Sequence, residues 1–295
     1  MQSWSAQNVP ENGRFTIQDY KSSVKPVWCA GCGNYGTMTA LLQALTELQI
    51  DPDKLMLSSG IGCASRFPYF VNAYSVHGVH GRALPVAVGM KVARPDLTVM
   101  VIGGDGDGFS IGGGHLPHVA RKNVDITYIV ANNSVYGLTK GQTSPTTWVG
   151  QKTTTSPVGA VDPPLNPVLA MLGYGTSFVA RGYAGKPKEL GELIVRAIKH
   201  PGFAFIEVLT PCPSFNKTLN FRMLNELVKP LPETHDPSNR AAAMTLAMEE
   251  NNFYLGVFCE AVRPPYSEHK RTIELRSGPF PDARAGVMEL MNGFA

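Results

Sequence analysis

The chain has 295 residues, 43% of them hydrophobic, which is enough to bury one large α/β core with a small appended piece. Its net charge is only +3 and it has no dense Lys/Arg run, which argues against a nucleic-acid partner. No stretch approaches the roughly 20 apolar residues of a membrane span, and the N-terminus lacks an apolar export signal, so we expect a soluble, cytoplasmic protein.

The N-terminal part of the chain should be an extended arm over residues 1–25, because proline, asparagine and glycine interrupt any periodic pattern there. A tight loop with the spacing Cys-x-x-Cys follows, from Cys29 to Cys32. Apolar residues at helical spacing then predict a helix from about Tyr35 to Gln49.

Five short apolar runs alternate with helical patterns and predict a doubly wound, mostly parallel sheet with helices on both faces, an α/β fold. We expect strands at 54–58, 99–102, 126–130, 176–180 and 204–209, and helices at 84–93, 112–121, 164–173 and 187–199. Residues 26–213 would form one domain. Residues 214–295 lose the alternation and contain several prolines, so we expect an irregular C-terminal extension that contacts a partner.

A glycine-rich motif at residues 103–108, Gly-Gly-Asp-Gly-Asp-Gly, ends the second strand, and Asn132-Asn133 ends the third. If these strands are parallel neighbours, Asp105 and Asn133 meet at the carboxyl edge of the sheet, where such folds bind ligands. The glycines would admit a phosphate, and Asp105 could bind Mg²⁺ that bridges to it. A Gly-rich turn alone would equally suit an ordinary strand–helix connection. The pairing with Asn-Asn, however, resembles the thiamine diphosphate motif, in which Asp105, Asn133 and the Val135 carbonyl would bind Mg²⁺.

Other loops should reach the same edge of the sheet, since they also follow strands or precede helices there. For His77 and His80 a structural role is an equal alternative to contact with the cofactor. We expect cofactor contacts from Ile61, Gly62, Cys63, Ala64, His80, Gly104, Asp105, Gly106, Asp107, Asn133, Gly137 and Leu138.

The five cysteines, an odd number in a chain without an export signal, indicate metal binding or free thiols rather than disulfides. Cys29, Cys32, Cys63 and Cys212 all fall in predicted loops. Four thiolates can bind a tetrahedral Zn²⁺ or a [4Fe–4S] cluster, and the spacing alone does not separate these from unligated thiols. Cys259 is most simply a small core residue or a free thiol.

Taken together, these motifs resemble the β subunit of the 2-oxoacid:ferredoxin oxidoreductases over about residues 25–215. The residues that carry the resemblance are Trp28-Cys29-Ala30-Gly31-Cys32-Gly33, Ile61-Gly62-Cys63-Ala64-Ser65, His77-Gly78-Val79-His80-Gly81-Arg82, the stretch Gly104 to Gly137, Gly141 to Thr147, and Pro211-Cys212-Pro213. The resemblance implies thiamine diphosphate, Mg²⁺ and one [4Fe–4S] cluster bound by Cys29, Cys32, Cys63 and Cys212. It also implies an α subunit that supplies the glutamate activating the aminopyrimidine, so this chain alone should be inactive.

The implied reaction is the oxidative decarboxylation of a 2-oxoacid, with the acyl group passed to coenzyme A and electrons leaving through the cluster to ferredoxin. An (αβ)₂ assembly is expected. The Cys-Ala-Gly-Cys loop and Lys140 after Gly-Leu-Thr look most like the 2-oxoglutarate branch, hence succinyl-CoA formation or the reverse reductive carboxylation. Arg66 and Lys140 are the candidates to pair with the substrate carboxylate, the alternative being solvated loop charges.

Three other functions stay open on sequence grounds. The chain could be a pyruvate-specific or broad-range member of the same family. It could instead be a non-oxidative thiamine decarboxylase or carboligase, which needs no cluster. If the chain is not an enzyme, it could be a binding module stabilised by zinc, in which the Gly-rich loop only shapes a turn.

Overall fold

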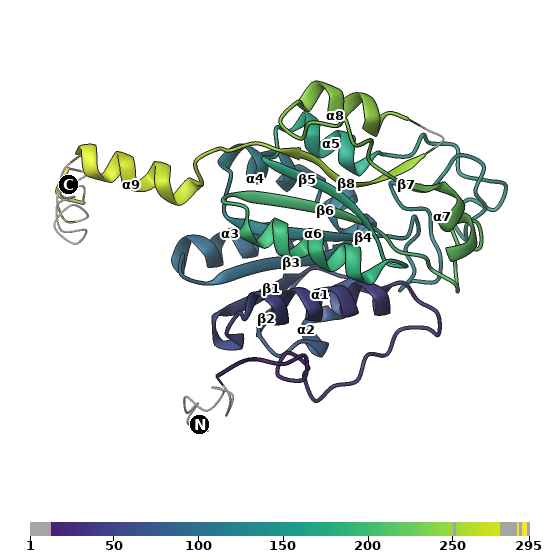
Figure 1. The fold of residues 1–295 in the computed structure, drawn as a ribbon, viewed down its shortest axis with the longest axis horizontal. Helices are drawn as coiled ribbons and strands as arrows, with labels where there is room; N and C mark the ends of the chain where they lie inside the picture. The colour runs from purple at the N-terminus through teal and green to yellow at the C-terminus, as the bar shows by residue number, and fades with distance from the viewer. Residues whose placement is uncertain (1–12, 250–251, 278–287, 289–290, 294–295) are drawn as a thin grey trace.

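The computed structural model describes residues 13–249, 252–277, 288 and 291–293. In this part of the chain an eight-stranded sheet has the order β2-β1-β3-β4-β6-β5-β8-β7 (Figure 1). The six strands from β2 to β5 in that order are parallel, β8 runs antiparallel to β5, and β7 is parallel to β8. The strands are β1 Leu55–Ser59, β2 Tyr74–His77, β3 Thr98–Gly104, β4 Ile126–Asn132, β5 Phe178–Tyr183, β6 Phe203–Leu209, β7 Val228–Pro230 and β8 Phe253–Glu260.

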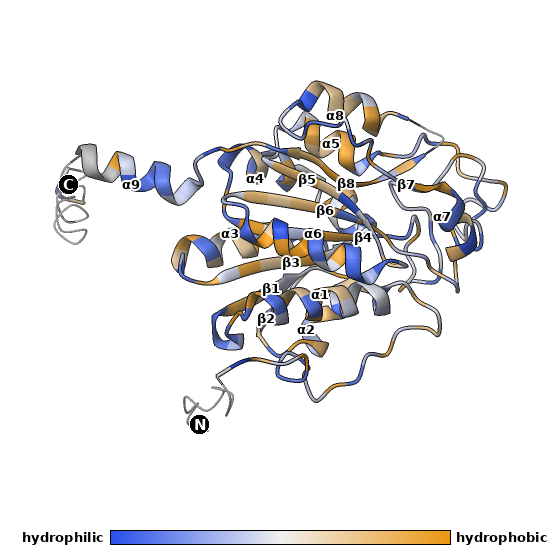
Figure 2. Ribbon diagram, viewed as in Figure 1, coloured by the Kyte–Doolittle hydropathy of each residue, from blue (hydrophilic) through white to orange (hydrophobic). Residues whose placement is uncertain are grey.

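Helices cover both faces of the sheet, which confirms the doubly wound fold predicted from the alternating pattern. One apolar core lies between the sheet and α1, α2 and α6, and a second lies between the opposite face and α3, α4, α5 and α8. The central strands are mostly coloured hydrophobic in Figure 2, as expected for strands buried on two faces. The helices are α1 Asn34–Leu48, α2 Phe67–Phe70, α3 Ala83–Ala93, α4 Leu116–Lys122, α5 Pro167–Gly173, α6 Pro187–Lys199, α7 Phe221–Leu227, α8 Arg240–Ala247 and α9 Tyr266–Ser277.

The predicted crossover helix at residues 112–121 is shorter than expected. A π-helical turn, Asp107–Ile111, and a 3₁₀ turn, Gly113–His115, come first, and α4 begins only at Leu116. Glycines at 112, 113 and 114 explain this, because glycine loses more backbone entropy in a regular helix than other residues.

Residues after 213 are more regular than the sequence pattern suggested. They contain α7, β7, α8, β8 and α9, and β7 and β8 extend the sheet beyond β5. Strand β8 was missed because Phe253–Glu260 lies in a segment that prolines flank, outside the regular alternation of strands and helices. Strand β2 was missed for the opposite reason, since it is short and half exposed. Helix α9 projects away from the body in Figure 1.

The N-terminal arm divides into two parts, of which residues 1–12 lie outside the described residues. The rest packs on the body: Tyr20 is fully buried, and Lys21 forms an isolated antiparallel bridge with Val71. Among the described helices, none combines the length and the apolar character that crossing a membrane would require.

Candidate functional site

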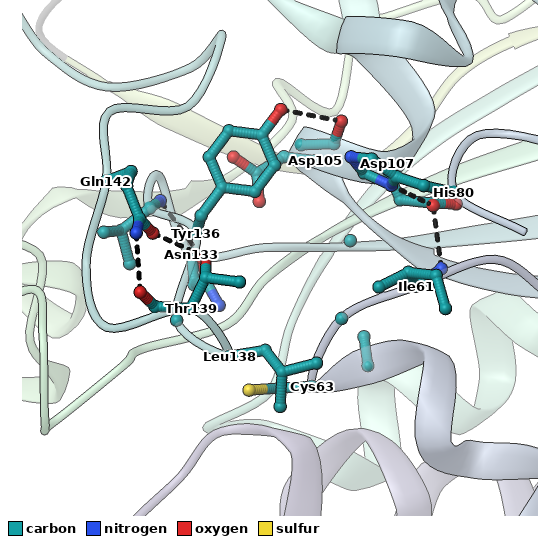
Figure 3. A pocket seen from close by; sticks show the side chains of 16 residues that line it. Ile61, Cys63, His80, Asp105, Asp107, Asn133, Tyr136, Leu138, Thr139 and Gln142 are labelled. Carbon is teal, nitrogen blue, oxygen red and sulfur yellow. Dashed lines mark hydrogen bonds and ion pairs between the residues drawn. The ribbon is translucent and has the colours of Figure 1, made fainter. Parts of the chain in front are cut away.

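The candidate site lies where β1, β3 and β4 end. These strands are parallel neighbours, so their carboxyl ends meet at one edge of the sheet. The loops that follow them enclose a cavity of about 330 Å³ (Figure 3). All twelve residues expected to contact a cofactor line this cavity, as does Val135. Its lining residues are Ile61, Gly62, Cys63, Ala64, His80, Gly104, Asp105, Gly106, Asp107, Asn133, Val135, Tyr136, Gly137, Leu138, Thr139 and Gln142.

Asp105 sits at the bottom of the site with its side chain 1% exposed. Its Oδ2 atom accepts hydrogen bonds from the hydroxyls of Ser144 at 2.5 Å and Thr146 at 2.7 Å. Burial raises the pKa of Asp105, while the hydrogen bonds from Ser144 and Thr146 lower it. The backbone amides of Asn133 and of Asp105 itself also act in the lowering direction.

The two adjacent asparagines at the end of β4 have different environments. Asn133 lines the cavity, and its Oδ1 accepts from the amide of Val135 at 3.1 Å. Asn132 is buried and turns toward β6, donating to Glu207 at 2.7 Å. The alternation of side chains along a strand separates the pair, so that only Asn133 can reach a ligand in the cavity.

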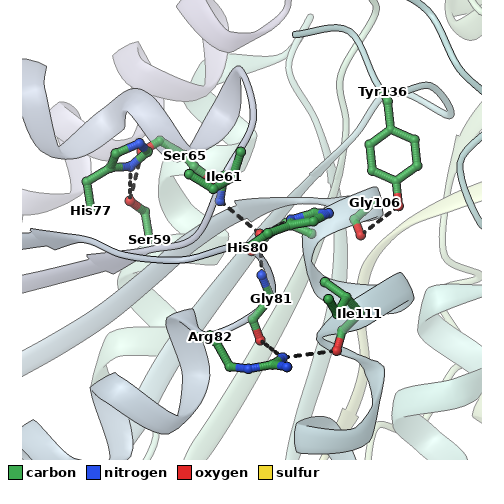
Figure 4. Close-up of polar contacts among 11 residues, drawn as sticks. Ser59, Ile61, Ser65, His77, His80, Gly81, Arg82, Gly106, Ile111 and Tyr136 are labelled. Carbon is green, nitrogen blue, oxygen red and sulfur yellow. Dashed lines mark hydrogen bonds and ion pairs between the residues drawn. The ribbon is translucent and has the colours of Figure 1, made fainter. Parts of the chain in front are cut away.

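Asp107 lines the cavity, where we expect a cofactor contact, and its carboxylate also accepts hydrogen bonds from the protein. The side chain is buried, and its Oδ1 accepts from the amides of Ile61 at 2.8 Å and Gly81 at 2.7 Å. The Nδ1 atom of His80 lies 2.8 Å from the same oxygen. Figure 4 shows Ile61 of one loop and His80 and Gly81 of another facing the same place, and Figure 3 shows Asp107 there. A side chain at Gly60 would lie 2.2 Å from this carboxylate, so glycine is required there.

His80 therefore has one ring nitrogen held by Asp107 while the ring borders the cavity. Its ring also meets that of Tyr136 edge-on, with the centroids 6.0 Å apart. His77, in contrast, contacts Ser59 through Nδ1 at 3.0 Å and is absent from the cavity lining. The two histidines of the His-Gly-Val-His motif thus separate into a cavity residue and one that contacts the end of β1.

Four of the five cysteines lie near one another beside the cavity. Trp28 donates to the Cys63 carbonyl at 2.7 Å, which ties the Cys29–Cys32 loop to the loop after β1. The amide of Gly33 donates to Pro211 at 3.0 Å, which ties the same loop to the segment of Cys212.

The electrostatics of the thiols agree with this proximity. Burial raises the pKa of the Cys32 thiol to about 11, and the neighbouring Cys212, Cys63 and Cys29 contribute to the rise. Burial and the neighbouring thiols also raise the pKa of Cys63, against which Arg66 acts in the lowering direction. Within the described residues, no group of three or more His, Cys, Asp or Glu side chains is arranged to hold a metal ion.

Gly137 lies beside two of these thiols. A methyl group at this position would be 3.6 Å from the Sγ atoms of both Cys63 and Cys212. Cys63 itself lines the cavity, so the group of thiols and the cavity share a wall. Cys259 lies elsewhere, fully buried in the core beside α8, as expected for a structural cysteine.

Arg66 and Lys140 flank the cavity without lining it. Arg66 is half-buried at the end of a 3₁₀ turn, Ala64–Arg66, and acts electrostatically on Cys63. Lys140 is exposed in the tight loop that follows β4 and has φ +84°, a left-handed conformation that is unusual for a side chain of this size. Such strain is often found in functional loops.

Sequence reasoning missed several residues of the site. The hydroxyls of Ser144 and Thr146 bind Asp105, and Tyr136 donates to the Gly106 carbonyl at 3.1 Å. Gln142 and Thr139 form two hydrogen bonds with each other at the rim. The run of hydroxyl residues from Thr143 to Thr147 was the available signal, because a buried carboxylate requires donors of this kind.

Comparisons with known proteins agree with this geometry. Residues 54–208 match a model described as the thiamine pyrophosphate enzyme, C-terminal TPP binding domain. Residues 212–274 match a model described as the C terminal of the pyruvate ferredoxin oxidoreductase beta subunit.

Related proteins cover most of the chain. The 2-oxoacid:ferredoxin oxidoreductase subunit beta of Saccharolobus solfataricus is 49% identical over 213 residues, 72% of this chain and 69% of its own. The 2-oxoglutarate synthase subunit KorB of Methanocaldococcus jannaschii is 39% identical over 85% of this chain and 94% of its own. A solved 2-oxoglutarate:ferredoxin oxidoreductase from Magnetococcus marinus, with 2-oxoglutarate, coenzyme A and succinyl-CoA bound, has a TM-score of 0.90 and 46% identity. That match covers 94% of this chain and 96% of the other.

Proposed function

The chain belongs to the family of 2-oxoacid:ferredoxin oxidoreductase β subunits, and on this premise we propose that it forms half of an active site for oxidative decarboxylation of 2-oxoglutarate. The products would be succinyl-CoA and CO₂, with the reductive carboxylation as the reverse. The electrons would pass to ferredoxin. The named relatives of the 2-oxoglutarate branch and the bound ligands of the Magnetococcus marinus enzyme support this choice of substrate.

The observation that carries the proposal is the wall shared by the cavity and the thiols, at Cys63. Thiamine diphosphate supplies the carbanion chemistry that releases CO₂ from a 2-oxoacid, and a [4Fe–4S] cluster accepts single electrons. A chain that holds both must keep them close to each other. Here the loop Ile61–Ala64 borders the cavity and contributes one of the four neighbouring thiols.

The donor set fits the proposed groups. A buried carboxylate at Asp105, an amide at Asn133 and a backbone carbonyl at Val135 are the hard oxygens that Mg²⁺ prefers. Glycines at 104 and 106 allow a diphosphate to approach the backbone closely. Thiols are the donors that iron–sulfur clusters use, and the ligands of a cluster beside the cavity would be Cys29, Cys32, Cys63 and Cys212.

The remaining residues of the site would orient the cofactor and substrate and shield them from water. Asp107 fixes the loops of Ile61 and Gly81 against the Gly-rich motif, so that cofactor contacts on three loops keep a constant geometry. The loop from Tyr136 to Gln142 covers one side of the cavity and would exclude water from it. Arg66 and Lys140 would pair with the carboxylates of the substrate from the rim.

An α subunit should complete the site. No glutamate among the residues that the structure describes lines the cavity, whereas the aminopyrimidine of thiamine diphosphate needs a carboxylic acid as its activating partner. We therefore propose that the α subunit provides it and that the two chains assemble as (αβ)₂. Turnover by the purified chain without an α subunit would contradict this part of the proposal.

The test is a comparison of the purified αβ complex with the chain alone, both prepared without oxygen. Iron and acid-labile sulfide should be found at about four each per β chain. Coenzyme A-dependent reduction of ferredoxin should be faster with 2-oxoglutarate than with pyruvate. Stoichiometric zinc in place of iron, or decarboxylation that needs neither coenzyme A nor an electron acceptor, would overturn the proposal.

A second candidate is a pyruvate-specific or broad 2-oxoacid enzyme. The match of residues 212–274 to a pyruvate ferredoxin oxidoreductase model favours it, as do relatives named only for 2-oxoacids. The same assay separates the two, because this candidate predicts equal or greater rates with pyruvate.

A further inference from the structure

A continuous series of buried polar contacts crosses three strands of the sheet and ends at the bottom of the cavity. Arg181 Nε on β5 donates to Glu207 on β6 at 2.6 Å, and Asn132 Nδ2 on β4 donates to the other oxygen of Glu207 at 2.7 Å. The Thr146 hydroxyl lies 2.8 Å from Asn132 Oδ1 and 2.7 Å from Asp105 Oδ2. All five residues are at most 5% exposed.

Stability alone does not explain why the ion pair at the start of this series is present. Taking Arg181 and Glu207 out of water costs free energy that their attraction often fails to recover, and apolar residues in such positions are frequently as stable. The guanidinium is further enclosed by two rings, with its carbon 5.3 Å from the Phe253 centroid and 5.4 Å from the Phe258 centroid. A role in orienting the neighbouring polar groups would account for an ion pair at this position.

The pair determines how the Asn132 amide is oriented. Glu207 offers only acceptors to this side chain, so the NH₂ group of Asn132 must face Glu207 and its Oδ1 must face the other way. On that side Oδ1 accepts from the amide of Ser134 at 3.1 Å and lies beside the Thr146 hydroxyl. If the amide were reversed, its NH₂ would face the Ser134 amide, which is itself a donor.

The Thr146 hydroxyl connects this amide to the carboxylate. Its single proton has Asp105 Oδ2 and Asn132 Oδ1 within hydrogen-bond distance, and Ser144 donates to the same Asp105 oxygen. Fixing Asn132 therefore fixes Thr146, and fixing Thr146 restrains the rotation of Asp105. The contacts of Asn132 with Glu207 and Thr146 also keep its side chain turned away from the cavity. Asn133 is therefore the amide that faces a ligand.

We propose that Arg181 and Glu207 are positioning residues for the metal–diphosphate site. They act through Asn132 and Thr146 on the carboxylate that would bind Mg²⁺. The inference rests on the proposed function, because it concerns the affinity of that site for Mg²⁺ and thiamine diphosphate. It also assigns a role to the C-terminal segment, since Phe253 and Phe258 of β8 enclose Arg181.

The experiment measures the Mg²⁺ concentration that half-saturates binding of thiamine diphosphate to the whole αβ complex, by calorimetry without substrate. The double variant Arg181→Met/Glu207→Gln removes both charges and keeps the side-chain volumes similar. It should raise the half-saturating Mg²⁺ concentration roughly 10- to 100-fold, the usual effect of losing an outer partner of a metal ligand. Thr146→Val should do the same, whereas Thr146→Ser, which retains the hydroxyl, should remain close to the wild type.

The control is Val179→Ala, two residues before Arg181 on β5, which weakens the same apolar core without touching the polar series. It should lower Tm while leaving the Mg²⁺ requirement unchanged. A purely structural role for the ion pair predicts the same outcome for the double variant. A half-saturating Mg²⁺ concentration within about twofold of the wild type, in both the double variant and Thr146→Val, would overturn the inference.

Two further outcomes are also decisive. If the double variant does not fold, the single variant Glu207→Gln decides in its place, because it replaces the acceptor-only partner that orients Asn132 and keeps the side-chain volume. If the wild-type complex takes up no thiamine diphosphate with Mg²⁺ present, the proposed function fails and the inference fails with it. If instead the wild type and the variants all bind thiamine diphosphate normally, only the inference is overturned. The two results are therefore distinguishable.

Discussion

The backbone amide of Ile61 donates a hydrogen bond of 2.8 Å to the carboxylate of Asp107. This contact joins the loop that carries Cys63 to the Gly-rich motif that carries Asp105. The two parts of the candidate site, one for the proposed cofactor and one for the proposed cluster, are therefore held in a fixed relation by a single buried side chain. Gly81 and His80 add two more contacts to the same oxygen.

Replacing Asp107 by asparagine should loosen both loops. The new side-chain amide would be a weaker, neutral acceptor for three donors, and we expect the free energy of unfolding to fall by about 2 kcal/mol. Binding of thiamine diphosphate to the αβ complex should weaken as well, because the loops of Ile61 and Gly81 would be less restrained. Chemical denaturation and calorimetry measure the two effects. The exposed Asp53→Asn is a matched control that should change neither, and an unaltered stability of Asp107→Asn would contradict the assigned role.

Replacing Gly137 by alanine should disturb the proposed cluster more than the fold. The added methyl group would lie 3.6 Å from the Sγ atoms of Cys63 and Cys212, an ordinary contact for the protein but an intrusion beside two ligands of a cluster. We expect a clear loss of iron and sulfide from the anaerobically purified complex, relative to about four irons per chain, with little change in Tm. Gly89→Ala, where an added methyl group meets nothing within 4 Å, is the control. A full iron content in Gly137→Ala would argue against a cluster at this position.

The main features of the fold could be predicted from the sequence because they depend on short-range patterns. Apolar runs that alternate with helical patterns indicate a doubly wound parallel sheet, and parallel neighbours bring Asp105 and Asn133 to one edge. Strand β8 could not be recognised in the same way, because its pairing with β5 is antiparallel and joins residues far apart in the chain.

The contacts of the site depend on the path of its loops, and this limits what sequence alone reveals. The sequence marks Asp105 and Asp107 as equivalent members of a repeated Asp-Gly pair. Their environments differ because Asp105 meets the hydroxyls of a loop about 40 residues later, whereas Asp107 meets amides from two loops before it. No spacing rule predicts this difference, so the sequence alone could not show that Asp107 also binds two backbone amides.

Lys140 provides a test of substrate choice. If its ammonium group pairs with the distal carboxylate of 2-oxoglutarate, Lys140→Met should reduce kcat/KM for 2-oxoglutarate by roughly 100-fold, the scale of a lost charge-assisted hydrogen bond of about 3 kcal/mol. Pyruvate lacks that carboxylate, so its kcat/KM should change much less. Steady-state rates with both substrates measure this ratio. Equal losses with the two substrates would rule out this assignment, and Lys152→Met in the following loop serves as a control for loss of charge alone.

The stability of the fold should depend on pH through His200, which lies at the edge of the sheet opposite the candidate site. His200 is 5% exposed, and its Nε2 atom lies 2.8 Å from the Ser177 hydroxyl. Burial lowers the pKa of His200, Arg196 adds to this, and the opposing effects of Glu260 and Asp125 do not cancel it. The folded protein therefore favours neutral His200, and the unfolded chain binds the proton more readily.

The sign of the effect follows from proton linkage. Above the ordinary histidine pKa of about 6.5 the contribution of His200 to stability is fully present, and it is lost as the pH falls below that value toward the lowered pKa of the folded state. The free energy of unfolding of the wild type should therefore decrease between about pH 7 and 5.5. In His200→Gln, which can still bond to Ser177 but does not titrate, this part of the decrease should be absent. Denaturation at several pH values measures both proteins, and parallel pH profiles would show that other groups cause the acid sensitivity.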